Sequence, residues 1–397
     1  MTRFFWFGLA ASLRRSMVLF CACVSAALAA GQVQGQTLPE ALSEDDVPIA
    51  LLVDAGTGQV LFARNPDRRF VPASITKAMT LYTAFELIEA GQLSLQQSLV
   101  VSPQAWMEWR GKGSRMFLNA EERVSVSKLL TGIATVSAND AAVVLAEGAA
   151  GSIPAWTAQM NAKARALGMT QSHFGTPNGW PDEGRTFTTA RDLVTLGTAL
   201  ADEHSRAFAR FIGLPEFRYG GITQPNRDPM LGRIEGADGI KTGFTNEAGF
   251  GFLGTAKRGD QRLVLVVGGV ARGSTRGRAA RNLVEWGFEA FDRRALFAEG
   301  AVVDTARVQN GERRTLDLVG QGAITLNVPK GREEAIRLTV LYSGPLHAPI
   351  NAGDRVATLE IQTPGMETVR VPLLARESVA KAGILARITN AIARWFS

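Results

Sequence analysis

Residues 72–80 read PASITKAMT and place Ser74 three positions before Lys77 at the start of a predicted helix. A lysine at this spacing lies on the same face of the helix as the serine. Serine is a weak nucleophile near neutral pH and needs a base within hydrogen-bond reach. The first helical turn adds free N–H groups and the positive end of the helix dipole. The segment therefore predicts either a nucleophile with its base or an ordinary polar helix start.

Two later motifs bear on this choice, which spacing alone does not settle because Ser125 and Lys128 repeat it. The triplet SAN at 137–139 lies between two predicted helices, where it could instead cap a helix that begins near Asp140. The triplet KTG at 241–243 lies near the start of a predicted strand. The order SxxK, SxN, KTG is typical of penicillin-binding proteins and class A β-lactamases.

The chain resembles the low-molecular-mass penicillin-binding proteins that are serine-type D-alanyl-D-alanine carboxypeptidases, like those of peptidase family S11. The resemblance runs from about residue 40 to the C-terminus, and it includes GSRMFL at 113–118, ARDL at 190–193, WGF at 286–288 and LHAP at 346–349. It implies an enzyme that removes the terminal D-alanine from peptidoglycan pentapeptide stems and is acylated by β-lactam antibiotics. It implies no cofactor and no metal.

The resemblance also implies a role for each residue of the motifs. Ser74 would attack the carbonyl between the two terminal D-alanines, and Lys77 would take its proton. Ser137 would relay a proton to the leaving amine, and Asn139 would hold the substrate amide.

The opposite wall of the site would consist of Lys241, Thr242 and Gly243. In the family, the N–H groups of the nucleophile and of the residue after the glycine, here Phe244, form the oxyanion hole. Because the backbone supplies both donors, the side chain of Phe244 can vary without loss of the hole.

A carboxypeptidase must bind the terminal carboxylate, for which the planar guanidinium of arginine is well suited. By resemblance we expect Arg278 in this role, with Arg227 as a second candidate. The region around Arg278 is two residues longer than the family pattern. Arg272 and Arg276 therefore stay open as alternatives.

A lysine that acts as a general base must be neutral, which requires its pKa to fall by about three units, or ~4 kcal/mol. Burial and a second positive charge both lower the pKa of a lysine. We expect Lys241 to supply that charge to Lys77.

The pattern along the chain predicts an α/β fold in which helices pack on an antiparallel, β-lactamase/transpeptidase-like sheet. Strands are expected within 48–64 and 238–270. Helices are expected at 72–90, 126–134, 140–149, 154–167, 188–203 and 276–292. The predicted domains are a signal peptide at 1–30, a catalytic domain at 40–295, a small all-β domain at 300–375 and an amphipathic helix at 377–397.

The N-terminal segment carries arginines, then an apolar run and small residues around Ala27–Ala29, which is typical of a secretory signal. An uncleaved membrane anchor is the alternative. Both cysteines, Cys21 and Cys23, lie within this segment, so we expect no disulfide in the mature protein.

The C-terminal residues 377–397 place Leu385, Ile388, Ile392 and Trp395 on one predicted helical face, with basic residues off it. This pattern suits a helix that lies in a membrane surface. The alternative is a helix docked on its own protein. The expected location is the periplasmic face of the cytoplasmic membrane, with a peripheral anchor.

The formal net charge is +6, but between the ends of the chain basic and acidic residues roughly cancel, which argues against a nucleic-acid partner. His173, His204 and His347 accompany no serine or carboxylate motif and are expected to be structural. Three alternative functions stay open: a DD-endopeptidase that cuts cross-links, a soluble β-lactamase, and a non-catalytic wall-binding protein.

Overall fold

The computed structural model describes residues 3–5, 46–331 and 336–383. These residues divide into two compact units, the larger unit (46–289) and the smaller unit (3–5 and 290–383). Each unit has its own hydrophobic core. The junction follows Glu289, a few residues before the domain boundary predicted from the sequence.

The larger unit contains a five-stranded antiparallel sheet in the order β3-β2-β10-β9-β8. Its strands are β2 (Ile49–Asp54), β3 (Gln59–Arg64), β8 (Ala237–Thr245), β9 (Gly249–Arg258) and β10 (Gln261–Val270). All six residues of β2 are buried, as expected of a strand with both faces covered. The strand β8 forms one edge of the sheet, so its outer side is available to other parts of the chain.

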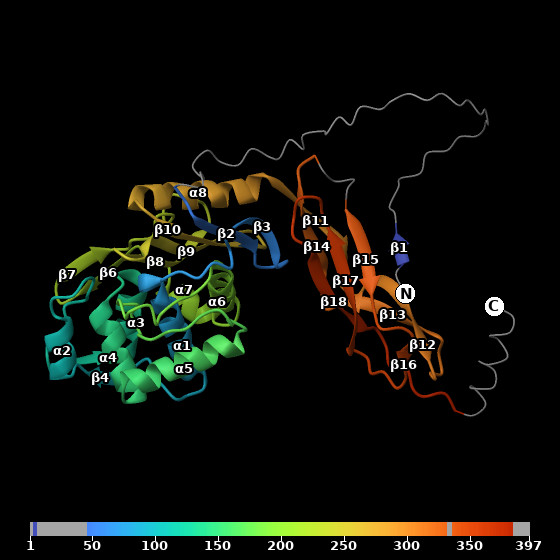
Figure 1. Ribbon diagram of the computed structural model, residues 1–397. Helices are drawn as coiled ribbons and strands as arrows, with labels where there is room; N and C mark the ends of the chain where they lie inside the picture. The colour runs from blue at the N-terminus through green and yellow to red at the C-terminus, as the bar shows by residue number, and fades with distance from the viewer. Residues whose placement is uncertain (1–2, 6–45, 332–335, 384–397) are drawn as a thin grey trace, which may run out of the picture. The chain divides into compact units, whose positions relative to one another are not determined.

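Helices cover both faces of this sheet (Figure 1). The helix α8 (Gly273–Glu289) lies over one face, while α1 (Lys77–Glu89) and α6 (Ala190–Asp202) pack against the other. The remaining helices of the larger unit are α2 (Pro103–Trp109), α3 (Val126–Thr135), α4 (Asn139–Ala150), α5 (Ile153–Ala166) and α7 (Ser205–Phe211). The α/β class predicted from the sequence is therefore confirmed.

Two short two-stranded sheets complete the larger unit. The strand β4 (Ser98–Val100) pairs with β5 (Arg123–Ser125), and β6 (Glu216–Tyr219) pairs with β7 (Ile222–Pro225). We did not predict these strands, nor the seven-residue helices α2 and α7, because such short segments show little periodicity.

The smaller unit is built from strands. A seven-stranded sheet has the order β1-β15-β17-β18-β13-β12-β16, and β11 pairs separately with β14. The strands are β1 (Arg3–Phe5), β11 (Phe291–Phe297), β12 (Val302–Gln309), β13 (Thr315–Gly320), β14 (Ile324–Pro329), β15 (Arg337–Leu341), β16 (Leu346–His347), β17 (Arg355–Gln362) and β18 (Val369–Ala375). The predicted all-β character of this region agrees with the structure.

The C-terminal segment differs from the prediction of a helix from residue 377. Val379 forms a β-bridge with Ile350, and Lys381 forms one with Gly311. The side chain of Val379 is fully buried in the core of the smaller unit. Residues 377–383 therefore belong to the β domain, and the remainder of the predicted helix, 384–397, lies outside the described residues.

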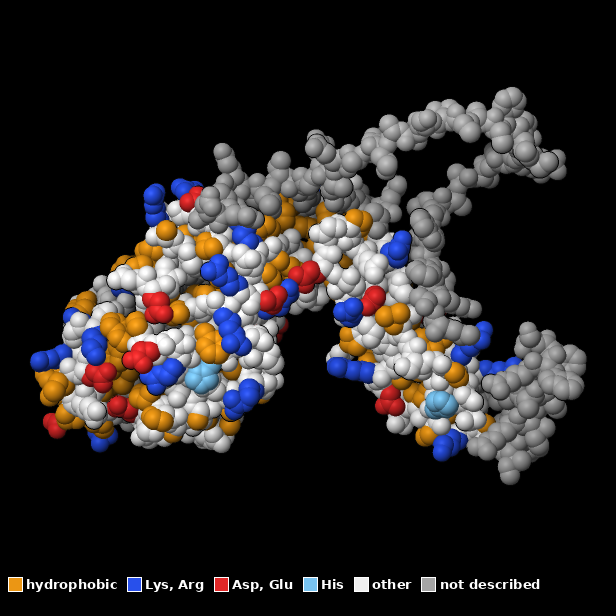
Figure 2. Space-filling model, in the orientation of Figure 1, with side chains coloured by type: hydrophobic (Ala, Val, Ile, Leu, Met, Phe, Trp, Pro, Cys, Tyr) orange, Lys and Arg blue, Asp and Glu red, His pale blue; other side chains and the backbone are white. Residues whose placement is uncertain are grey.

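On the face of the larger unit seen in Figure 2, basic and acidic side chains are interspersed. Within the described ranges, none of the helices is both long enough and apolar enough to cross a membrane. The predicted signal segment lies outside the described residues except for β1, whose backbone pairs with β15.

Candidate active site

The turn that carries Ser74 is a short 3-10 helix, η2 (Ala73–Thr76), which leads directly into α1. The loop around Gly179 presses on this turn. A Cβ at Gly179 would lie 1.8 Å from the carbonyl oxygen of Ala73, and the residue has φ +71°. Both facts require glycine at position 179. The close contact fixes the backbone immediately before the serine.

Lys77 is fully buried, and its Nζ lies close to three oxygens. The distances are 2.8 Å to Ser74 Oγ, 2.7 Å to Asn139 Oδ1 and 2.7 Å to the carbonyl oxygen of Asn178. The pairing of Ser74 with Lys77 that the motif predicts is therefore present. We did not predict Asn178, which follows Lys77 by 101 residues in a loop.

Burial lowers the pKa of Lys77 well below its ordinary value, and the positive charge of Lys241 lowers it further. Arg227 acts in the same direction, while the carboxylate of Asp140 opposes these effects. The expected coupling between the two lysines agrees with this order of causes, although burial has the larger effect.

The SAN motif joins the end of α3 to the start of α4. Ser137 has φ +63°, and Ala138 is the N-cap of α4 with no side-chain capping bond. The amide of Asn139 accepts a hydrogen bond from Lys77 and donates from Nδ2 to the carbonyl oxygen of Lys112 at 3.3 Å. Because Nδ2 carries a second hydrogen, these contacts are compatible with holding the substrate amide, and that role of Asn139 stays a prediction.

Strand β8 forms the opposite wall. Lys241 is 3% exposed, and its Nζ donates to the carbonyl oxygen of Thr242 at 3.0 Å. A Cβ at Gly243 would lie 2.4 Å from the carbonyl oxygen of Pro72, so the glycine lets the strand approach the nucleophile turn. The exposed ring of Phe244 stacks on Phe250 with centroids 4.1 Å apart.

Burial, followed by the charges of Arg227 and Arg276, lowers the pKa of Lys241 to about 7, against the opposing charge of Asp228. Burial raises the pKa of Asp228 to about 6. We did not predict Asp228. Its carboxylate supplies a negative charge near the positive groups Lys241, Arg227 and Arg276.

A pocket of about 510 Å³, which we call the first pocket, lies between these walls. Its lining includes most of the predicted site residues, namely Ser74, Ser137, Asn139, Arg227, Thr242, Gly243 and Phe244, together with Asn178, Trp180, Phe250 and Arg276. Lys77 and Lys241 are not in the lining and lie behind it.

The choice of arginine requires a correction. Arg278 is exposed and does not line the first pocket, whereas Arg276 does. Positions two apart on an α-helix point about 200° apart, so the two side chains leave α8 on nearly opposite sides. Arg272 is exposed and precedes α8. Among the described residues, Arg276 and Arg227 are therefore placed to meet an anionic ligand.

The second Ser-x-x-Lys pair is an ordinary helix start. Ser125 is the N-cap of α3, and its Oγ accepts a hydrogen bond from the backbone N–H of Lys128 at 3.4 Å. The Nζ of Lys128 lies over the ring of Tyr219, 5.7 Å from its centroid.

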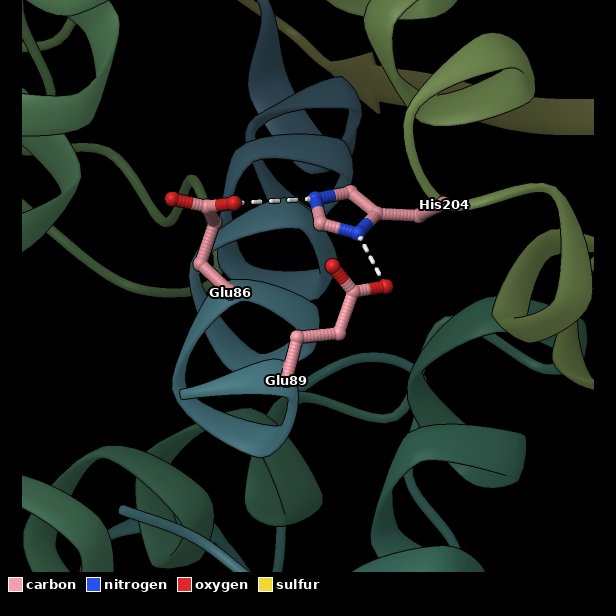
Figure 3. A group of neighbouring side chains, drawn as sticks. All are labelled: Glu86, Glu89 and His204. Atoms are coloured by element: carbon pink, nitrogen blue, oxygen red, sulfur yellow. Dashed lines mark hydrogen bonds and ion pairs between the residues drawn. The ribbon is translucent and has the colours of Figure 1, made fainter. Parts of the chain in front are cut away.

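The histidines lie away from the first pocket. The Nδ1 atom of His173 lies 2.8 Å from the carbonyl oxygen of Arg185. His347 belongs to β16 of the smaller unit. His204 accompanies no carboxylate motif in the sequence, but in the structure its two ring nitrogens face Glu89 Oε1 at 2.8 Å and Glu86 Oε1 at 3.4 Å (Figure 3).

These three side chains offer ligand atoms within 4.8 Å of one another, as a metal site would. However, each ring nitrogen of His204 faces a different carboxylate, and Glu86 also pairs with Lys163. The arrangement is that of an ion-pair network which ties the end of α1 to the segment before α7. Sequence could not indicate it, because His204 follows Glu89 by 115 residues.

Comparison with known proteins agrees with this geometry. Residues 38–271 match the family described as D-alanyl-D-alanine carboxypeptidase, and residues 291–381 match the C-terminal domain of penicillin-binding protein 5. The chain is 33% identical over 356 residues to D-alanyl-D-alanine carboxypeptidase DacC of Escherichia coli. The match covers 87% of this chain and 88% of that protein.

Solved structures give the same result. Penicillin-binding protein 5 from Haemophilus influenzae is similar with a TM-score of 0.77 and 28% identity, over 87% of this chain and 100% of that one. Penicillin-binding protein D2 from Listeria monocytogenes, in an ampicillin-bound form, is similar with a TM-score of 0.54 and 28% identity, over 62% of this chain and 98% of that one. The chain therefore belongs to the D-alanyl-D-alanine carboxypeptidase family of penicillin-binding proteins.

Proposed function

We propose that this protein is a serine-type D-alanyl-D-alanine carboxypeptidase that trims peptidoglycan pentapeptide stems through an acyl-enzyme on Ser74. The observation that carries this proposal is the 2.8 Å contact between Ser74 Oγ and Lys77 Nζ, beside a pocket that the KTG strand closes. A serine paired with a buried lysine of lowered pKa is what nucleophilic catalysis near neutral pH requires.

The surroundings of Lys77 orient its lone pair. A neutral amine has two N–H groups and one lone pair, and two of its three neighbours, Asn139 Oδ1 and the carbonyl of Asn178, can only accept. In the neutral state those two oxygens therefore take the N–H groups. The lone pair is left to accept the proton of the Ser74 hydroxyl as Oγ attacks the carbonyl carbon of the scissile bond.

The tetrahedral oxyanion would be stabilised by the backbone N–H groups of Ser74 and Phe244, each worth about 2.7–4 kcal/mol of barrier. Collapse breaks the C–N bond, and the leaving amine of D-alanine takes a proton through Ser137, which lines the first pocket. Water then attacks the ester carbonyl, its proton returns through Lys77, and Ser74 is regenerated.

Recognition of the terminal carboxylate is assigned to the positive wall of the pocket. Arg276 and Arg227 both line it, and Lys241 lies behind them. A guanidinium can bind a carboxylate through two parallel N–H···O bonds. The same groups suit the carboxylate of a penicillin, and we propose that β-lactams acylate Ser74.

We further propose that the protein is exported and held at the periplasmic face of the cytoplasmic membrane. Support comes from the sequence, with a signal-like N-terminus and an amphipathic pattern within residues 384–397. In this arrangement the smaller unit would lie between the anchor and the catalytic unit along the chain.

The test of the proposed activity is release of D-alanine from a synthetic pentapeptide by purified protein. We expect release by the wild type and none above background by Ser74→Ala, while Ser125→Ala, the serine of the second Ser-x-x-Lys pair, keeps the wild-type rate. A cross-linked stem dimer assayed in parallel measures any endopeptidase share. Equal release by wild type and Ser74→Ala would rule out the proposed nucleophile.

A further inference from the structure

A second pocket, of about 180 Å³, lies in the larger unit beside the first one. Its wall is formed by α2 and the loop that follows, and it presents the rings of Trp106, Trp109 and Phe117 together with Arg110 and Arg115. Nothing in the proposed reaction uses these side chains. A cavity of about 150 Å³ holds one benzene molecule, so the second pocket can take one side chain of a larger ligand.

The two pockets are lined by residues that follow one another in the chain. Gly113 and Ser114 line the first pocket and the next residue, Arg115, lines the second. In the same way, Asn139 lines the first pocket and Asp140 the second. The ring of Trp109 also packs edge-on against Trp180, a wall of the first pocket, with centroids 5.4 Å apart. Because consecutive Cα atoms are about 3.8 Å apart, the two pockets lie close to each other along this wall.

The second pocket is positively charged. The guanidinium of Arg110 lies over the ring of Trp106, 4.7 Å from its centroid, and that of Arg115 lies over Phe117 at 5.0 Å. Within the described part of the chain, neither arginine forms an ion pair with a carboxylate. Both charges are thus held in place by aromatic rings and remain available to an anion.

One carboxylate, that of Asp140, also lines the second pocket. Its oxygens accept hydrogen bonds from the backbone N–H groups of Met116 at 3.1 Å, Leu118 at 3.3 Å and Ala141 at 2.9 Å. Three donors therefore hold this carboxylate in place, and the two arginines of the lining outnumber its single negative charge. The arginines on the other walls set the charge that an entering group meets.

The ring of Phe117 supports a binding role. It is 42% exposed, and its backbone has φ +65°, a conformation that costs a bulky residue free energy. A large apolar side chain held in this way on a pocket rim is more typical of a ligand contact than of a folding contact.

We propose that the second pocket binds the carboxylate of an acidic residue in the stem peptide, upstream of the bond cleaved at Ser74. This inference rests on the proposed function, because it concerns the same substrate. The positive charge of the two arginines indicates a carboxylate, and the neighbouring lining residues of the two pockets indicate a part of the peptide near the scissile bond. The pocket would thus help the enzyme distinguish acidic from amidated stems.

The experiment compares two pentapeptides that differ at one upstream position, glutamate in one and glutamine in the other. We expect the wild type to show a kcat/KM for the glutamate peptide about tenfold above that for the glutamine peptide, as a charged hydrogen bond provides. In Arg115→Gln this ratio should fall to about two, because kcat/KM falls for the glutamate peptide and stays unchanged for the glutamine peptide. Arg206→Gln, an exposed arginine on α7, is the matched control and should keep the wild-type ratio.

Acylation by labelled penicillin, which has no such residue, serves as the check on the first pocket. If the wild type is not acylated, the proposed function fails; if it is acylated but does not prefer glutamate, the second-pocket proposal alone is overturned. Should Arg115→Gln fail to fold, Arg110→Gln carries the same prediction. A loss seen only with a sugar-linked pentapeptide, and not with the free peptide, would also overturn the proposal, because it would place a sugar in the pocket.

Discussion

At the scale of single residues, the site depends on how Lys77 is held. Its burial and the charge of Lys241 favour a neutral amine. Its two carbonyl neighbours take the N–H groups of that amine and leave its lone pair facing Ser74. A lysine is otherwise charged near neutral pH and cannot accept a proton. In the proposed mechanism, the protonation state of this one side chain therefore controls acylation.

Replacing Lys241 by glutamine should move the pH dependence of acylation. The positive charge of Lys241 lowers the pKa of Lys77, so its removal raises that pKa, and the acid limb of the acylation rate shifts to higher pH. The measurement is the rate of labelling by penicillin as a function of pH. Lys128→Gln, from the second Ser-x-x-Lys pair, is the control. An unshifted acid limb in Lys241→Gln would disprove the coupling.

Replacing Asn139 by aspartate should have a related effect through direct contact. The amide oxygen lies 2.7 Å from Lys77 Nζ, and a carboxylate there would favour the ammonium form, raising the pKa of Lys77 by about 1–3 units. Acylation near neutral pH should fall about tenfold or more. Stopped-flow labelling of this variant beside Asn351→Asp, an exposed change in the smaller unit, tests it; recovery of the rate at higher pH is the specific signature.

The sequence predicted the motif residues because each motif is a short local pattern and the order of the three motifs along the chain is characteristic. It could not indicate Asn178 or Asp228, which approach the lysines only through folding. Its first choice of arginine, Arg278, is exposed and does not line the first pocket, whereas Arg276, which it left open as an alternative, does. Side chains that act through distant contacts leave no local pattern.

At the scale of elements, three segments meet at the nucleophile: the turn η2, the edge strand β8 and the loop that contains Gly179. Two glycines allow this meeting, since a Cβ at Gly243 or Gly179 would overlap the backbone of the turn. The catalytic geometry is therefore set by backbone packing as much as by the side chains.

The substitution Gly179→Ala should disrupt this packing. The new methyl group would lie 1.8 Å from the carbonyl oxygen of Ala73 at φ +71°, so the turn must move. We expect a loss of more than about 3 kcal/mol in the free energy of unfolding and loss of penicillin labelling. Gly184→Ala, with φ +79° but nothing within 4 Å, should cost only about 1 kcal/mol and retain labelling.

Urea unfolding of the two glycine variants provides the comparison. Equal losses in the free energy of unfolding would show that the positive φ accounts for the whole effect. The contact with the nucleophile turn would then contribute nothing. Retained labelling in Gly179→Ala would contradict the role assigned to this loop.

The long helices and the central strands were predicted nearly to their ends, because their apolar periodicity is strong. The N-cap Thr189 of α6, for example, accepts a hydrogen bond from the N–H of Asp192, as the capping pattern at 188–192 indicates. The predicted start of the C-terminal helix was wrong: Val379 is apolar in a helical pattern, but it forms an isolated β-bridge with Ile350 of the smaller unit. Tertiary pairing here overrides local propensity.

At the scale of the whole molecule, the chain divides into a catalytic unit and a β unit with separate cores. The last described residues, up to 383, complete the β unit, with Val379 and Ala382 buried. The proposed C-terminal anchor is therefore confined to residues after 383.

Two truncations separate these roles. A chain that ends at residue 383 should keep the thermal stability of the full chain but lose binding to anionic lipid vesicles, since each basic residue near the surface adds about 1 kcal/mol of attraction. A chain that ends at 376 should also lose stability, because it lacks Val379. Vesicle co-sedimentation and calorimetry measure the two effects. Unchanged vesicle binding by the chain ending at 383 would exclude the anchor.

The central claim is that Ser74 is the residue acylated. Its most direct test is mass spectrometry of the protein after incubation with a penicillin, with peptide mapping of the adduct. The account predicts a covalent adduct on the peptide that contains Ser74, and none in Ser74→Ala. An adduct on any other serine, Ser125 or Ser137 included, or persistence of the adduct in Ser74→Ala, would contradict it.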